Sequence, residues 1–322
     1  MSMNRILVTG SSGHLGEALV TRLRNDGHDV VGLDILPGPT TTTVGSICDP
    51  AVVGRVMAGV DAVVHTATLH KPHVATHTRE QFVATNLTGT VRVLEAAAAA
   101  GVERFVFTST TSAFGRALTV ASGAPAAWIS EEVVPIPKNI YGVTKVAAED
   151  LCELVHRDTG LPCLVLRTSR FFPEDDDDPG ARDRYGDQNL KANEFLYRRV
   201  EIGDAVDAHL LALARAPELG FDKFIISATT PFSREHTAAL GTDAAAVVAG
   251  LFPEVVSLYA DRGFTLPASL DRVYDNARAR RVLGWRPRFD FRHVLDRLAA
   301  GHDVLGPLAA TIGRKGYHRP AP

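Results

Sequence analysis

The sequence predicts an α/β protein whose parallel β-sheet is covered by helices on both faces. Three observations carry this prediction. Strand-like and helix-like stretches alternate over the first half, the strand-like stretches are almost wholly apolar, and each helix-like stretch between them ends in a glycine. Strands covered on both faces read as continuous apolar runs, and glycine is common just after a helix. The alternation favours right-handed crossovers and a doubly wound sheet.

The expected elements follow in order along the chain. The apolar, strand-like runs are at 5–10, 29–34, 61–67, 104–110 and 163–168. The helix-like stretches between them are at 14–27, 86–101 and 141–160. Beyond a Pro-, Gly- and Asp-rich loop, the sequence predicts a helix at 204–216 and a strand at 223–228 that returns to the sheet. We therefore expect a core at 1–169 and a smaller, mainly substrate-binding region at 170–322, over the carboxyl edge of the sheet.

Composition argues against several classes of partner. The chain has 322 residues and a formal net charge of −3, which gives no electrostatic reason to expect nucleic acid or an anionic membrane. No apolar run reaches the roughly 20 residues of a membrane-spanning helix, and no signal peptide is recognisable. Cys48, Cys152 and Cys163 lack metal-ligand spacing. We expect a cytoplasmic protein without a bound metal.

Residues 9–16 read TGSSGHLG and lie between the first strand and the first helix. Glycines at this spacing allow a tight turn, a close approach of backbone to a pyrophosphate, and close packing of the helix on the strand. The helix N-terminus adds free N–H groups and the positive end of a dipole. The turn predicts a Rossmann-type dinucleotide site at Gly10, Ser12, Gly13, His14, Leu15 and Gly16.

An acidic residue at the end of the second strand supports this site. Asp34 stands there, and a carboxylate at that place can accept hydrogen bonds from the hydroxyls of the adenosine ribose. The same charge repels a 2′-phosphate, and no arginine follows directly in ILPGPT. The sequence therefore predicts NAD as the cofactor in preference to NADP, with Ile35 beside it.

Tyr141 and Lys145 are four residues apart on a predicted helix and share one face. A phenol with the ordinary pKa of about 10 is a poor base at neutral pH. A neighbouring ammonium and the positive nicotinamide ring would stabilise the phenolate and lower that pKa. Thr110, at the end of the 104–110 strand, could supply a second hydrogen bond to the substrate oxygen. These residues predict hydride chemistry with Tyr141 as acid and base.

Together these motifs resemble the extended short-chain dehydrogenase/reductase family, in its NAD-dependent epimerase/dehydratase branch, over most of the chain. TGSSGHLG is similar to the family's TGxxGxxG, NLTGT at 86–90 to its NxxGT, and YGVTK at 141–145 to its YxxxK. The resemblance, which is closest to nucleotide-sugar 4-epimerases, implies a homodimer and assigns Thr110, Tyr141 and Lys145 to catalysis, the last two also touching the cofactor. It implies further cofactor contacts at Ser46, Ile47, Thr66, Ala67, Thr68, Asn86, Thr108, Ser109 and Thr168.

Departures from the family pattern limit the reactions that the protein could catalyse. Sugar-nucleotide dehydratases of the family carry acids where this chain has Thr111 and Ser112, and a hydroxyl cannot replace those acids near neutral pH. Dehydration and decarboxylation are disfavoured, and Thr111 and Ser112 become candidate substrate contacts. There remain an epimerase that takes and returns hydride, which we favour slightly, and a dehydrogenase of a sugar, sugar acid or other small substrate that releases reduced cofactor. A non-catalytic NAD sensor is the third alternative.

Two further residues are candidate substrate contacts. Arg170 stands where nucleotide-sugar epimerases of the family commonly have an asparagine that contacts the substrate diphosphate. An arginine binds a carboxylate or phosphate well, which favours an anionic substrate, but Arg170 could equally pair with the acidic residues at 174–178. His70 opens the stretch LHKPHVATH, for which substrate contact, a metal site and an exposed loop all stay open.

Overall fold

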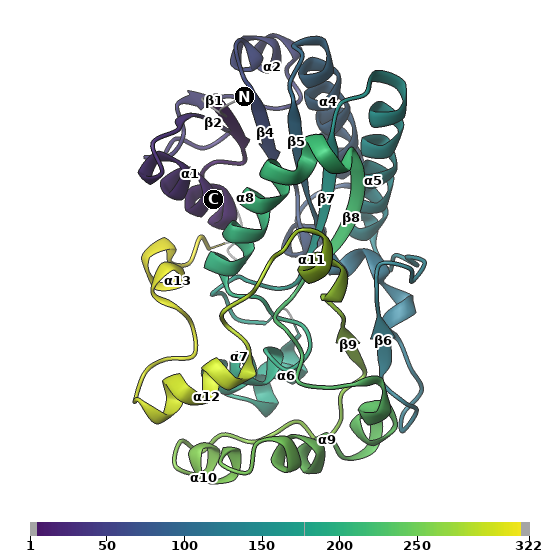
Figure 1. The fold of residues 1–322 in the computed structure, drawn as a ribbon, viewed down its shortest axis with the longest axis vertical. Helices are drawn as coiled ribbons and strands as arrows, with labels where there is room; N and C mark the ends of the chain where they lie inside the picture. Colours follow the sequence, from purple (N-terminus) through teal and green to yellow (C-terminus); the bar gives the residue numbers. More distant parts are fainter. Residues whose placement is uncertain (1–4, 177, 317–322) are drawn as a thin grey trace.

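The structure is a computed structural model that describes residues 5–176 and 178–316. Its centre is a sheet of seven parallel strands, in which the first strand lies between the second and the fourth (Figure 1). The predicted doubly wound α/β fold is therefore confirmed. In spatial order the strands are β3 (Thr43–Val44), β2 (Asp29–Asp34), β1 (Arg5–Thr9), β4 (Ala62–His65), β5 (Arg104–Thr110), β7 (Cys163–Thr168) and β8 (Phe221–Ile226).

Helices cover both faces of this sheet. The helices on each face share a buried apolar cluster with β1, β4, β5 and β7, because alternate residues of these strands face opposite sides. Val8 and Val106 belong to one cluster, and Leu7 and Phe107 belong to the other. Because both faces are covered, β4 and β7 are buried at every position. The first face carries α1 (His14–Asn25) and α8 (Ile202–Leu219), and the second carries α2 (Pro50–Met57), α4 (Thr90–Ala99) and α5 (Ile140–Thr159).

Several elements differ from the sequence prediction. α2 was not predicted, although the side chain of Asp49 caps it by accepting from two backbone N–H groups of its first turn. The helix expected from residue 86 begins instead with a π-helical turn, η2 (Ala84–Gly89), which leads into α4. The strand expected at 223–228 starts two residues earlier as β8 and pairs with β7.

Most residues after 170 build a smaller layer at the carboxyl end of the sheet (Figure 1). A third apolar cluster, which includes Phe195, Leu240 and Phe291, forms its interior. Residues of the first half take part, because β6 (Ala127–Ile129) pairs in parallel with β9 (Arg272–Tyr274). The remaining short elements are η1 (Lys71–Ala75), α3 (Arg79–Val83), η3 (Thr111–Phe114), η4 (Arg116–Leu118), α6 (Pro179–Arg184), α7 (Asp187–Glu194), η5 (Arg234–His236), α9 (Thr237–Leu251), α10 (Val255–Ala260), α11 (Ala277–Val282), α12 (Phe291–Ala299) and α13 (Pro307–Ile312).

Two kinds of feature are not found over the described ranges 5–176 and 178–316. None of their helices combines the length and the apolar character needed to cross a bilayer. No three His, Cys, Asp or Glu side chains among them are grouped as metal ligands. A cavity lies at the carboxyl ends of the parallel strands.

Candidate active site

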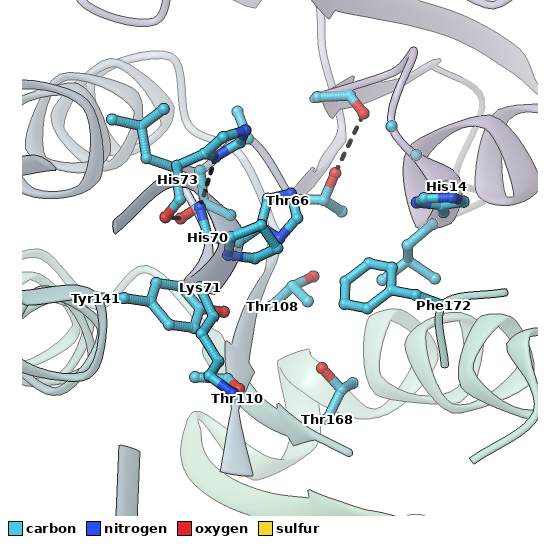
Figure 2. A pocket seen from close by; sticks show the side chains of 18 of the residues that line it. His14, Thr66, His70, Lys71, His73, Thr108, Thr110, Tyr141, Thr168 and Phe172 are labelled. Carbon is cyan, nitrogen blue, oxygen red and sulfur yellow. Dashed lines mark hydrogen bonds between the residues drawn. The ribbon is translucent and has the colours of Figure 1, made fainter. Parts of the chain in front are cut away.

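A cavity of about 670 Å³ opens at the carboxyl ends of the strands. Doubly wound sheets bind ligands at this edge, beside the point where the strand order reverses, which here is between β1 and β4. All residues predicted for the site line this cavity, with Asn86 as the exception. Figure 2 shows side chains from distant parts of the chain pointing toward one another across it.

The glycine turn forms one end of the cavity. Gly10 has a φ of +72°, and a Cβ on it would lie 2.8 Å from the backbone nitrogen of Ala67. A Cβ on Gly16 would lie 1.9 Å from the carbonyl oxygen of Gly10. No side chain caps the start of α1, so the first N–H groups of that helix border the cavity without an intrahelical acceptor. The turn is therefore a cradle shaped for backbone contact with an anion.

Asp34, the last residue of β2, lines the cavity near the glycine turn. Its Oδ2 accepts a hydrogen bond from the backbone nitrogen of Ser12 at 2.9 Å, and its Oδ1 accepts from that of Leu36 at 2.9 Å. The exposed side chain of Ile35 and the residues Ser46 and Ile47 line the cavity nearby. Asp34 thus joins the glycine turn to the loop after β2.

Thr66, Ala67 and Thr68 follow β4 and line the middle of the cavity. Asn86, in contrast, is buried behind them. Its side chain accepts from the backbone nitrogen of Leu69 at 2.8 Å and donates to the carbonyl of Leu69 at 2.9 Å. Asn86 therefore supports the loop after β4 and does not itself face the cavity.

Tyr141 and Lys145 project from the first turns of α5, and Thr110 ends β5 beside them. The side chain of Asn139 caps α5 by accepting from the nitrogen of Gly142 at 3.0 Å. The Nζ of Lys145 donates to the carbonyl of Thr108 at 2.8 Å, and the Thr110 side chain lies near enough to Tyr141 to lower its pKa. The three predicted catalytic side chains therefore line one cavity, and Figure 2 shows two of them, Tyr141 and Thr110.

The electrostatics of this trio differ from the expectation. Burial raises the pKa of Tyr141 to about 12, although the hydrogen bond with Thr110 lowers it. Burial also lowers the pKa of Lys145 to about 7, against the negative charge of Glu149. The expected lowering of the Tyr141 pKa is therefore not found in the chain by itself, because loss of hydration outweighs the local donors.

A buried carboxylate holds α5 on the sheet next to this trio. Glu149, one turn beyond Lys145, accepts from the hydroxyl of Ser109 at 2.5 Å and from the guanidinium of Arg167 at 2.7 Å. Thr108 and Thr168 are also engaged. The Thr108 hydroxyl contacts His209 Nε2 at 2.8 Å, and that of Thr168 donates to the carbonyl of Ser109 at 2.8 Å.

Arg170 lines the cavity, but its guanidinium is held by contacts with nearby residues. Its Nη2 donates to the carbonyls of Glu174 and Asp175, at 3.3 Å and 2.7 Å. The carboxylates of Asp176 and Glu194 lie 3.7 Å from other nitrogens of the guanidinium. The alternative in which Arg170 pairs with the acidic segment is thus the arrangement in the structure.

The three histidines of the loop after β4 all line the cavity. The rings of His70 and His73 are 4.4 Å apart, and those of His73 and His77 are 5.0 Å apart, between centroids. His70 also stacks on Phe172 at 5.4 Å. These contacts build an aromatic wall.

Several lining residues were missed by the sequence reading. Some of them, such as Lys71 and Phe172, adjoin predicted residues, whereas others, such as Arg272, are brought in by tertiary folding and leave no local signal. Thr111 and Ser112, which were predicted, line the same cavity as Arg198 and Arg272, which were not. The missed set includes Lys71, Phe172, Glu174, Asp176, Arg198, Arg272, Tyr274 and Lys315.

Comparisons with known proteins agree with this geometry. The model of the NAD dependent epimerase/dehydratase family matches residues 6–220. A UDP-glucose 4-epimerase of Mycolicibacterium smegmatis is 30% identical over 315 residues, which are 88% of this chain and 94% of that enzyme. A 3-beta-hydroxysteroid dehydrogenase of Mycolicibacterium neoaurum is 30% identical over 187 residues, and the match spans only 49% of that enzyme's length.

Solved structures give the same picture. A short-chain dehydrogenase/reductase superfamily protein from Agrobacterium tumefaciens, with bound NAD, superposes with a TM-score of 0.66 at 26% identity over 92% of this chain and 96% of that one. MoeE5 in complex with UDP-glucose and NAD gives a TM-score of 0.65 at 26% identity over 91% and 96%. From the matched residues and from the agreement along nearly the whole chain, we conclude that this protein belongs to the NAD-dependent epimerase/dehydratase family.

Proposed function

We propose that the protein is an NAD-dependent epimerase of a sugar or nucleotide sugar. The observation that carries the proposal is the meeting of Tyr141, Lys145 and Thr110 in one cavity with the glycine turn. An acid–base pair beside a dinucleotide cradle suits the removal and return of hydride at a carbinol carbon. A relative named UDP-glucose 4-epimerase, similar over nearly its whole length, supports the same assignment.

The cavity fits NAD. The Gly10 and Gly16 positions, where a Cβ would collide with backbone, and the uncapped start of α1 would receive the pyrophosphate. Asp34 would receive the adenosine ribose, with Ile35, Ser46 and Ile47 beside the adenine. When bound, NAD supplies the hydride acceptor and, once reduced, the hydride donor. Neighbouring structures at 26% identity contain NAD, which supports this assignment.

The catalytic roles follow from the surroundings of each side chain. Tyr141 takes the proton from a substrate hydroxyl and gives it back when the ketone is reduced. Thr110, which lines the cavity beside Tyr141, hydrogen-bonds the same substrate oxygen. Lys145, held against the carbonyl of Thr108, brings a positive charge that favours the phenolate when the lysine is protonated.

Basic residues in the lining of the cavity support an anionic, nucleotide-linked substrate. Arg198 and Arg272 line the cavity, as do the hydroxyl-bearing residues Thr111 and Ser112. Guanidinium groups suit phosphate or carboxylate oxygens. Since hydroxyls occupy the places of the dehydratase acids, an unassisted loss of water from the sugar is disfavoured.

We also infer the assembly and location of the protein. Val143 and Leu154 are exposed on α5, and Val83 is exposed on α3. Apolar exposure of this kind suits a homodimer built around α4 and α5. The free thiols at Cys48, Cys152 and Cys163 suit the reducing cytoplasm. We also propose that the chain is divided into a cofactor-binding core at 1–169 and a substrate-binding region at 170–322.

The test is absorbance at 340 nm with purified protein, NAD and a panel of nucleotide sugars, free aldoses and uronic acids. A new sugar isomer by NMR, without accumulation of NADH, is the expected result. Steady accumulation of NADH would replace the epimerase by a dehydrogenase, and relatives named uronate dehydrogenase and 3-beta-hydroxysteroid dehydrogenase give that outcome a basis. NAD binding without turnover of any substrate would indicate a sensor.

A further inference from the structure

The segment 171–176 borders the cavity, which is lined by Phe171, Phe172, Glu174 and Asp176. The ring of Phe172 packs edge-on against His14 of the glycine turn, with centroids 5.2 Å apart. The same ring stacks on His70, with centroids 5.4 Å apart. Figure 2 shows Phe172 between these two histidines, on the side of the cavity opposite Tyr141. The segment therefore touches both the proposed cofactor cradle and the aromatic wall.

Glu174 connects the 171–176 segment to the glycine turn through His14. Its Oε1 lies 2.9 Å from Nε2 of His14, and the side chains are only 6% and 0% exposed. His14 is the first residue of α1, directly after Gly13. Burial raises the pKa of Glu174, but the contact with His14 and two backbone donors outweigh it and bring the pKa to about 2. The carboxylate is therefore ionised at neutral pH.

The C-terminal part of the described chain fastens the same carboxylate. The backbone nitrogen of Lys315 donates to Oε1 of Glu174 at 2.7 Å. The ammonium of Lys315 pairs with Glu17 on the first turn of α1. Figure 1 shows α13, which shortly precedes Lys315, close to α1. Glu174 thus ties two regions that are far apart in sequence, the 171–176 segment and the part of the chain around Lys315, to the N-terminus of α1.

The far end of the segment is also held. The carboxylate of Asp176 pairs with Arg198 at 2.9 Å, and the carbonyl of Asp175 accepts from Arg170 at 2.7 Å. Both arginines line the cavity. A movement of the segment away from the cavity would have to break at least one of these contacts.

From these contacts we infer that Glu174, acting through His14 and Lys315, is a positioning residue that retains the cofactor in its cradle during turnover. The inference rests on the proposed function and sharpens it. An epimerase must hold the reduced cofactor until the hydride is returned, whereas a dehydrogenase must release it in every cycle. The contact between Glu174 and His14 would thereby bias the protein toward internal return of the hydride.

The experiment measures the rate at which NADH leaves the full-length protein. NADH fluorescence is followed in a stopped-flow instrument after mixing the loaded protein with excess NAD. Glu174→Gln keeps the size of the side chain and removes its charge, while His14→Phe keeps an aromatic ring against Phe172. Each variant should release NADH at least tenfold faster than the wild type. The double variant should be no faster than the faster single one, because both remove the same contact.

Three further measurements make the result decisive. Glu218→Gln, which removes an exposed partner of Arg215 far from the cavity, should leave the release rate unchanged. A chain that ends at Arg314 should release NADH faster, since it lacks the Lys315 donor. Melting temperatures within a few degrees of the wild type would show that each variant is folded.

The outcomes distinguish a failure of the proposed function from a failure of the retention role of Glu174. If the wild type binds no NADH, the proposed function fails. If the wild type binds NADH but folded Glu174→Gln and His14→Phe release it at the wild-type rate, the retention role is wrong and the proposed function stands. Rates that multiply in the double variant would likewise refute the role, because the two side chains would then act independently.

Discussion

Tyr141 is the residue whose chemistry the proposal needs most. Replacing it with phenylalanine keeps the ring in its buried place and removes the group that moves the proton. Turnover of the best substrate should fall by about 10²–10⁴-fold, the usual contribution of a positioned acid–base group. NAD binding, measured by calorimetry, should be unchanged. Residual activity above about a tenth of the wild type would refute the assigned role.

The residues that sequence could identify are those whose signal is local. Tyr141 and Lys145 lie one helical turn apart, and the glycines of the turn have a fixed spacing, so both patterns survive without knowledge of the fold. Arg170 shows the limit. Its chemistry suggested a substrate anion, but whether the acidic segment engages it depended on how a loop without regular structure folds back on itself.

Helix α5 and strand β5 keep their relative position through Glu149. Replacing this carboxylate with glutamine leaves Arg167 buried, at 3% exposure, without its charged partner. Removing one partner of a buried pair lowers the free energy of unfolding by about 3–5 kcal/mol. Urea denaturation should show that loss for Glu149→Gln. Asp150→Asn, whose side chain is 69% exposed, is the control and should change the free energy of unfolding by less than about 0.5 kcal/mol.

Helix α1 and strand β1 approach closely because Gly16 has no side chain. Gly16→Ala should lower the melting temperature by several degrees, since its Cβ would overlap the carbonyl oxygen of Gly10. Gly54→Ala is the opposite case, because it lies within α2 and its Cβ would meet nothing within 4 Å. That change should stabilise the protein by about 0.5–1 kcal/mol. Equal effects of the two substitutions in a thermal melt would contradict this explanation.

Among the helices and strands, the positions predicted best from the sequence are those of strands that are buried along most of their length. Covered strands such as β5 and β7 are long apolar runs, so their positions could be predicted closely. The short strands β3, β6 and β9 could not, since two or three residues show no periodicity. The pairing of β6 with β9 also joins segments that are widely separated in sequence, and no local propensity encodes such a pairing.

At the scale of the molecule, two buried histidines make folding sensitive to acid. Burial lowers the pKa of His65 to about 3 and that of His209 to about 4. The hydrogen-bond partners agree with neutral rings, because Nδ1 of His209 faces the carbonyl of Ala205, which can only accept, and Nε2 faces the Thr108 hydroxyl. In the unfolded chain both rings take up protons below a pH of about 6.5.

The sign of the effect follows from linkage. Because the unfolded state binds more protons, the free energy of unfolding falls as the pH drops below about 6.5 and is unaffected by these groups above it. Each histidine should change the folding equilibrium constant about tenfold per pH unit near pH 5. His209→Gln should reduce the slope by about one proton in urea titrations between pH 5 and 6.5. His302→Gln, at an exposed ring, is the control, and an unchanged slope for His209→Gln would contradict the account.

The late return of β8 to the edge of the main sheet has a consequence for how the chain is made. On the ribosome, β7 emerges well before its outer neighbour, and everything from the 171–176 segment to the end of α8 must be synthesised before β8 can pair. During that interval β7 presents unpaired backbone groups and apolar side chains, which is the state in which nascent chains join one another wrongly. The yield of native protein in the cell should therefore depend on chaperones that shield this edge until residue 226 has emerged.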